Sequence, residues 1–198
     1  MRGSSLLFLA LLVSASPSLA ESEAEAPAET VEVKPRKPSE VRAEQLDILL
    51  ARLHKSEGSG REPLEAKIWA LWSSSDSPTA EVLLQQAQKA MEAGAPAESM
   101  SILDRLVGAH PDFAEAWNKR ATLYYLMKRD DASLADIDKV LDLEPRHFGA
   151  LAGKGMILQR QKKYSAAREA YEDALAINPG IQQVKSALKE LDRLEQGI

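Results

Sequence analysis

Cysteine is absent from this chain of 198 residues, and histidine occurs only as His54, His110 and His147. Without cysteine there can be no disulfide framework, thiolate zinc site, iron–sulfur cluster or cysteine nucleophile. Three scattered histidines leave almost no room for a multi-histidine metal site. We therefore expect neither a metal nor another cofactor.

Aromatic residues are scarce, at 5%, and basic residues are outnumbered by acidic ones. Ala, Leu, Glu, Lys and Arg dominate, and this composition favours helices over a sheet sandwich. With 44% apolar and 28% charged residues the chain is globular in character, and its net charge of −5 disfavours binding to nucleic acid.

Long hydrophobic runs are also missing. The apolar run Leu6–Val13 has eight residues, whereas a helix that spans a bilayer needs about 20. Arg2 precedes this run, and small residues at Ser18 and Ala20 follow it, as in a signal peptide cleaved between Ala20 and Glu21. We expect residues 1–20 to be removed and the protein to be exported without stable membrane insertion, an uncleaved anchor being the alternative.

The segment that follows, residues 21–38, reads ESEAEAPAETVEVKPRKP and has little to bury. A segment of this composition cannot offset its ordering entropy, so we expect a disordered linker.

A period of 34 residues organises the rest of the chain. Pro111, Pro145 and Pro179 are spaced by 34. The same shift aligns large residues with large ones and small with small, as at Leu103, Ile137 and Tyr171, or Ala87, Ala121 and Gly155. Such a period indicates stacked supersecondary repeats.

The pattern resembles the tetratricopeptide repeat family, in which each repeat is a helix–turn–helix unit. The resemblance implies an all-α, right-handed superhelical solenoid with repeats at 80–113, 114–147 and 148–181. Departures from the family pattern are Gln86, Arg120 and Lys154 in place of leucine, and Ser99 and Ser133 in place of alanine.

Both ends of the array have helical patterns of their own. Residues 39–79 are predicted to form a degenerate helix pair that starts at Ser39 as N-cap and precedes the array, with Trp69 and Trp72 at packing positions. Residues 182–198 are predicted to form a capping helix with an apolar stripe at Val184, Leu188, Leu191 and Leu194.

The middle repeat has an apolar stripe with helical spacing, made by Trp117, Ala121, Tyr124 and Met127. We expect Trp117 and Tyr124 in the core and Tyr125 outside it.

Patterns of catalysis or metal binding are weak. The sequence has no P-loop, no dinucleotide fingerprint and no recognisable nucleophile turn, so we expect no enzyme. His110 and His147 read as loop histidines rather than ligands, and Asp136 and Asp138 as a solvated helix face.

The resemblance implies a concave groove, formed by the first helix of each repeat, that holds a partner peptide. The implied groove residues are Glu81, Leu84, Gln88 and Met91, then Glu115, Asn118, Thr122 and Tyr125, then Gly149, Ala152, Met156 and Gln159. Some family members bind a chaperone's terminal carboxylate with Lys and Asn residues. Here the matching positions are Leu84, Gln88, Lys119, Gly149 and Gly153, so that activity is expected to be absent.

The resulting hypothesis is an exported adaptor or scaffold that binds a protein or peptide partner. We expect it in the periplasm, with secretion from the cell as the alternative. The alternative is a self-assembling scaffold whose groove is filled by its own tail, residues 21–38, or by a second copy.

Overall fold

A computed structural model describes residues 36–195 of the chain. The predicted signal peptide (residues 1–20), the cleavage site between Ala20 and Glu21, the linker up to residue 35 and the last three residues of the predicted capping segment lie outside the described residues.

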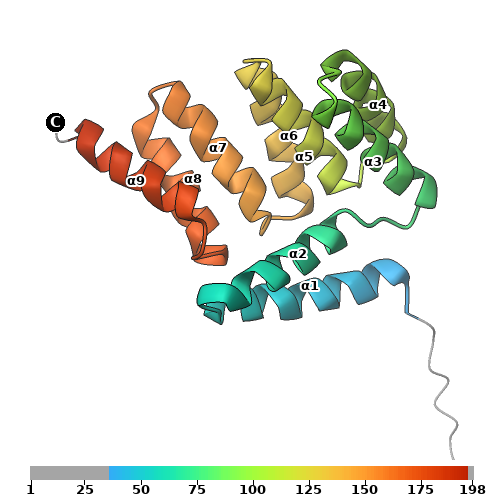
Figure 1. Cartoon of the computed structure of the whole chain (residues 1–198), viewed down its shortest axis with the longest axis horizontal. Coiled ribbons are helices and arrows are strands. Elements are labelled where there is room, and N and C mark those ends of the chain that lie inside the picture. Colours follow the sequence, from blue (N-terminus) through green and yellow to red (C-terminus); the bar gives the residue numbers. More distant parts are fainter. Residues whose placement is uncertain (1–35, 196–198) are drawn as a thin grey trace, which may run out of the picture. The chain divides into compact units, whose positions relative to one another are not determined.

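Every regular element of the described residues is a helix (Figure 1), which confirms the all-α repeat fold. The helices are α1 (Pro38–Lys55), the short 3₁₀ helix η1 (Gly58–Gly60), α2 (Arg61–Trp72), α3 (Pro78–Glu92), α4 (Pro96–Ala109), α5 (Ala114–Leu126), α6 (Asp130–Leu143), α7 (Phe148–Arg160), α8 (Tyr164–Ile177) and α9 (Gln182–Glu195). The pairs α3–α4, α5–α6 and α7–α8 occupy the three predicted repeats.

The turns follow the period of the sequence. Pro111, Pro145 and Pro179 lie in the turns after α4, α6 and α8, where proline prevents the helix from continuing. The turns inside the pairs each place one residue in the left-handed region, at Gly94 (φ 70°), Lys128 (φ 58°) and Lys162 (φ 62°). These three positions are also 34 residues apart, so one backbone geometry is used three times.

Small residues allow the two helices of a pair to approach closely. Ser99 and Ser133, where the family pattern has alanine, are fully buried and donate hydrogen bonds to the carbonyls of Ala87 (2.9 Å) and Ala121 (2.7 Å). Gly155 lies against the ring of Tyr171, and a Cβ atom at this glycine would clash with that ring. The small residues that recur with the period therefore lie where the two helices of a pair meet.

Ion pairs link consecutive repeats. Arg120 bonds Asp136 through Nε and Nη2, both at 2.8 Å, and reaches Asp104 at 2.9 Å, while Lys154 bonds Asp138 at 2.9 Å. The prediction that Asp136 is solvated is wrong, because this carboxylate is buried against Arg120. The two cations that depart from the family pattern therefore serve as links between helices.

The stripe of the middle repeat is more exposed than predicted. Trp117 and Tyr124 are only partly buried, and Met127 is 46% exposed. Guanidinium groups cover the aromatic rings instead, with Arg120 4.9 Å from the Trp117 ring and Arg129 4.7 Å from the Tyr124 ring. Around the middle repeat the buried core is formed by aliphatic and small residues such as Ala121, Ile137 and Val140.

The C-terminal helix α9 packs on α8. Val184 and Leu191 are buried with Tyr171 and Leu158, Leu188 is partly buried, and Leu194 is 43% exposed. The last residue of the predicted stripe thus lies outside the packed interface.

The N-terminal pair α1–α2 differs from its prediction in both start and position. Helix α1 begins at Pro38, so Ser39 is not the N-cap; proline suits the first helical position, and Glu40 accepts a hydrogen bond from the Lys37 N–H at 3.2 Å. The pair shares its core not with α3–α4 but with Phe148, Ile177 and Ile181.

Candidate functional site

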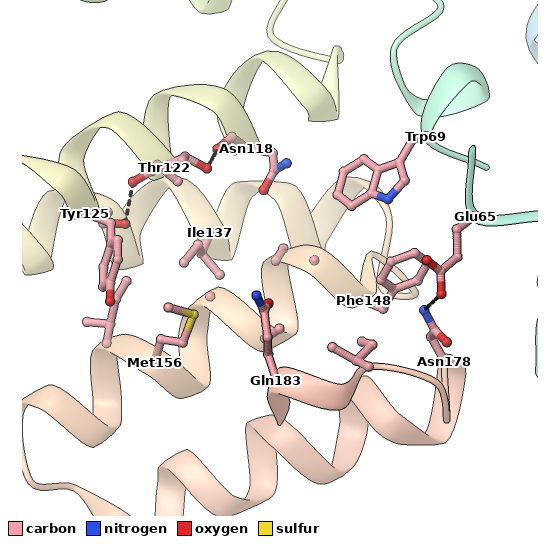
Figure 2. Close-up of a pocket in the computed structure, with 18 of the residues that line it drawn as sticks. Glu65, Trp69, Asn118, Thr122, Tyr125, Ile137, Phe148, Met156, Asn178 and Gln183 are labelled. Atoms are coloured by element: carbon pink, nitrogen blue, oxygen red, sulfur yellow. Dashed lines mark hydrogen bonds between the residues drawn. The ribbon is translucent and has the colours of Figure 1, made fainter. Parts of the chain in front are cut away.

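A cavity of about 610 Å³ lies between α2, α5, α7 and the start of α9 (Figure 2). Its lining is mostly apolar and comes from segments far apart in the sequence: Glu65, Trp69, Asn118, Ala121, Thr122, Tyr125, Leu126, Ser133, Ile137, Phe148, Gly149, Ala150, Ala152, Gly153, Met156, Ile157, Asn178, Gly180, Ile181, Gln182 and Gln183. Ligand sites in proteins are commonly concave, apolar and supplied with a few polar groups of this kind.

Part of the predicted groove lines this cavity. The predicted residues that do so come from the second and third repeats and are Asn118, Thr122, Tyr125, Gly149, Ala152 and Met156. Gln159 lines an adjoining cavity of about 680 Å³, which shares Tyr125, Ala152 and Met156 with the first.

The predicted residues of the first repeat lie elsewhere. Leu84 is 3% exposed and belongs to the core of α3 and α4, so its prediction as a groove residue is wrong. Glu81 accepts a hydrogen bond from the Ser75 N–H (2.7 Å), and Gln88 donates one to Glu92 (3.1 Å). Neither side chain lines the cavity, nor does Met91, which packs against the core.

Glu115 is fully buried rather than presented to a ligand. Its carboxylate lies 2.9 Å from Lys119 Nζ and 3.1 Å from His147 Nε2, and it accepts a hydrogen bond from Asn118 Nδ2 at 3.0 Å. Burial on its own raises the pKa of the Glu115 carboxyl, but the hydrogen bond with His147 and the charge of Lys119 outweigh burial, so the pKa lies below its usual value. Glu115 therefore organises the wall of the cavity as a carboxylate.

His147 is the second buried member of this cluster. Its Nδ1 accepts a hydrogen bond from the Ala150 N–H at 3.1 Å and so caps α7, which assigns the ring hydrogen to Nε2, beside Glu115. The ring also stacks on Trp72 at 4.0 Å. Thus His147 has a structural role, as predicted for a loop histidine.

The wall supplied by α2 was not predicted. The Trp69 ring meets His147 and Phe148 edge to face at 5.3 and 5.6 Å, and lies so close to Gly149 that a Cβ there would be 2.6 Å from Cη2. Nearby, Asn178 donates to Glu65 (2.8 Å) and accepts from Arg61 (3.1 Å). No local sequence pattern predicts that residues 65–72 contact residues 147–149 and 178.

Two of the polar groups that line the cavity present acceptors. With the Asn118 amide nitrogen bonded to Glu115, its carboxamide oxygen points into the cavity (Figure 2). Thr122 Oγ1 donates its hydrogen to the Asn118 carbonyl at 2.9 Å, so its lone pairs remain available. These acceptors suit the N–H groups of a polypeptide backbone.

The adjoining cavity is rich in tyrosine. The Tyr171 hydroxyl donates a hydrogen bond to Gln159 at 2.8 Å, and burial, together with the neighbouring Tyr125, raises the pKa of Tyr171 to about 12. The Tyr125 ring lies under the Arg160 guanidinium at 4.1 Å, and Arg160 pairs with Asp130. Both tyrosines offer apolar rings with polar tips.

Two features of the described residues bear on other kinds of site. In residues 36–195 no group of three or more His, Cys, Asp or Glu side chains is arranged to hold a metal ion. None of the helices α1–α9 has the length and apolar character required to cross a membrane.

Comparison with protein families finds the tetratricopeptide repeat in two places, at residues 84–143 and 148–181. A TPR repeat-containing protein of Rhizobium etli is 36% identical over 181 residues, which cover 89% of this chain and 85% of the relative. Mouse DnaJ homolog subfamily C member 3 is 29% identical over 113 residues, which are 57% of this chain and only 22% of that protein.

Solved structures show the same fold. The first TPR of Spaghetti bound to an HSP90 peptide, SRMEEVD, superimposes with a TM-score of 0.59 at 21% identity, covering 61% of this chain and 96% of that one. MamA superimposes with a TM-score of 0.56 at 17% identity, covering 72% of this chain and 86% of that one.

Proposed function

The chain belongs to the tetratricopeptide repeat family, and from this premise we propose that it binds a segment of a partner protein in the cavity between α2, α5, α7 and α9. The family carries the coarser assignment, a protein-interaction module, and a solved neighbour has a peptide bound. The location of the site on this chain is the specific part of the proposal.

The supporting observation is the composition of the cavity. Asn118, Thr122 and Tyr125 from α5 meet Ala152 and Met156 from α7 around one hollow. Side chains that project from two successive repeats, with acceptors beside apolar groups, suit a polypeptide that crosses both helices.

A pair of matched substitutions tests the site. Met156 is 44% exposed and lines the cavity, whereas Met127 is 46% exposed and does not. A photoreactive amino acid at Thr122 in intact cells should first capture the partner. Affinity for that partner should then fall at least tenfold, about 1.4 kcal/mol, in Met156→Lys, because a lysine would be desolvated against apolar groups.

Met127→Lys is the control and should bind as the wild type does. Equal affinities for the two variants would contradict the groove and direct attention to the opposite face of the repeats. Capture of a second copy of this chain at Thr122, with a mass that rises with concentration in sedimentation, would instead identify the self-assembling scaffold.

We further propose that the protein works after export, with the periplasm as its compartment and its partner there. The apolar run at Leu6–Val13 and the small residues at Ser18 and Ala20 support this assignment. N-terminal sequencing of the exported protein should begin at Glu21. Recovery of intact residues 1–20 on membrane-bound material would contradict it.

A further inference from the structure

We infer, resting on the proposed function, that the cavity takes an uncharged stretch of polypeptide that places one large apolar side chain over Gly153. Three properties of the cavity lead to this partner: an open position on α7, the acceptors at its rim, and a lining in which the described residues include no basic side chain.

The open position is Gly153, one of the three glycines of α7. Gly149 and Gly153 are four residues apart, so they lie on the same face of the helix. The space over Gly149 is filled by Trp69 of the chain's own α2, since a Cβ there would be 2.6 Å from the indole. Over Gly153 the nearest atom to such a Cβ is Ile137 Cδ1 at 3.6 Å, an ordinary contact, and this position opens into the cavity.

The surroundings of Gly153 select an apolar side chain. Ile137 and Met156 flank the position, and Figure 2 shows both turned toward the hollow. A partner's aromatic or long aliphatic side chain would then occupy the space over Gly153 as Trp69 occupies the space over Gly149. Large apolar side chains of this kind commonly provide most of the affinity of an interface.

The acceptors select the partner's backbone. The Asn118 side chain is 8% exposed, and its oxygen points into the cavity while its nitrogen is held by Glu115. With Thr122 Oγ1 it can receive two N–H groups of the segment that carries the apolar side chain.

The charges disfavour an acidic partner. No lysine, arginine or histidine lines the cavity among the described residues, and Glu65 does line it. Two neighbouring cations are paired with carboxylates, Lys119 with Glu115 at 2.9 Å and Arg160 with Asp130, and the Arg61 guanidinium donates to Asn178 and to the Ser56 carbonyl. A carboxylate of the partner would be desolvated here without a counter-ion, which is costly.

Peptide selection tests this inference. Residues 21–198 are exposed to a phage-displayed library of random dodecamers, and affinities of selected peptides are measured by fluorescence polarisation beside the acidic peptide SRMEEVD. Selected peptides should share one Phe, Trp, Leu or Met position with no Asp or Glu next to it, and should bind at least tenfold more tightly than SRMEEVD.

Variants at Gly153 connect this preference to the structure. Gly153→Leu should weaken the selected peptides at least thirtyfold, whereas Gly108→Leu, at an exposed helical glycine of α4 with open space around it, should not. If circular dichroism shows that Gly153→Leu does not fold, Gly153→Ala tests the inference instead. Its methyl group fits without a clash, and it should shift the preferred side chain of the selected peptides from aromatic to smaller.

The outcomes separate the two proposals. Selection of acidic peptides, or full affinity in Gly153→Leu while Met156→Lys loses binding, would overturn the inference and leave the groove as the site. Peptides that bind Met156→Lys as tightly as the wild type would overturn both.

Discussion

The two ends of the repeat array are closed in different ways. At the C-terminus, α9 packs on α8, its neighbour in the sequence, through Val184 and Leu191. At the N-terminus, α1–α2 turns away from α3 and docks where α6 meets α7 and α8 ends. His54 Nδ1 lies 2.9 Å from the Ala176 carbonyl, 122 residues away.

This difference separates two kinds of stability. In a solenoid each repeat normally contacts only its neighbours, so the loss of one end remains local. The α9 end obeys this rule. The α1–α2 end does not, because Trp69 and Trp72 pack on His147 and Phe148, and Glu65 accepts a hydrogen bond from Asn178. We therefore expect damage to α1–α2 to loosen the start of α7, and damage to α9 to loosen only α8 and α9, together with the part of the cavity wall that α9 supplies.

The largest effect is expected at Trp72. It is 7% exposed, stacks on His147 at 4.0 Å and lies 5.0 Å from Phe148. Trp72→Ala should lower the free energy of unfolding by about 3–5 kcal/mol in denaturant titrations, because it removes a large buried ring. Hydrogen exchange should also rise at the start of α7, far away in the sequence.

Ile48→Ala is the control for this prediction. Ile48 lies in the same helix pair but is 54% exposed, so its truncation should change the stability by less than about 0.5 kcal/mol. If both variants lose equally little, α1–α2 is not docked through its tryptophans, and the comparison between the two ends fails.

The next effect concerns Leu191 of α9, which is fully buried in the core that α9 shares with α8. Truncation of a buried leucine costs about 2–5 kcal/mol, but a terminal helix can unfold on its own and so limit the loss. Leu191→Ala should therefore cost about 2–3 kcal/mol, with faster hydrogen exchange confined to α8 and α9. Faster exchange in α1 as well would show that the two ends are coupled.

The sequence predicted the α9 end better than the α1–α2 end for a physical reason. Repeats that stack on their neighbours bury equivalent positions, so their large residues recur with the period of the sequence. Leu103, Ile137 and Tyr171 recur in this way, and all three are buried. A helix pair that docks on residues far away in the sequence does not repeat with that period. The related feature in the sequence is Gly149, where the absence of a side chain leaves space for Trp69.

The candidate site divides in the same way. The family resemblance implied that Thr122, Tyr125 and Met156 are groove residues, and they do line the cavity. The same resemblance implied Leu84 and Glu115, which are buried. For Glu115 the cause is again long-range, since its carboxylate is paired with the buried His147, 32 residues away.

A smaller effect is expected at Glu115, which links the docked pair to the cavity. Glu115→Gln keeps the shape of the side chain but leaves Lys119 without its partner carboxylate. It should lower the free energy of unfolding at neutral pH by about 1–3 kcal/mol in denaturant titrations. A loss below about 0.5 kcal/mol would contradict a role for this cluster.

The cost of Glu115→Gln should depend on pH with a definite sign. The pKa of Glu115 is lowered in the folded state, so its carboxylate stabilises the fold above the ordinary value of 4.5, and this contribution is lost as the pH falls through the lowered value. The difference between wild type and Glu115→Gln should therefore be constant near neutrality and shrink in acid. A difference that grows in acid would contradict the assigned direction.

The smallest effect is expected at one exposed ion pair from each end of the array. Asp47 of α1 lies 2.6 Å from Arg146, and Asp192 of α9 lies 2.8 Å from Arg168. The carboxylates are 63% and 52% exposed, and pairs of this kind contribute about 0.2–1 kcal/mol and weaken with added salt. Asp47→Asn and Asp192→Asn should each cost no more than that at low ionic strength, and close to nothing in about 1 M salt, where the Debye length is about 3 Å. Asp47→Asn could instead lower the stability as much as Trp72→Ala does, or keep its full effect in high salt. Either result would mean that charge, rather than the aromatic stack, holds α1–α2 in place. The contrast between the two ends would then need a different physical cause.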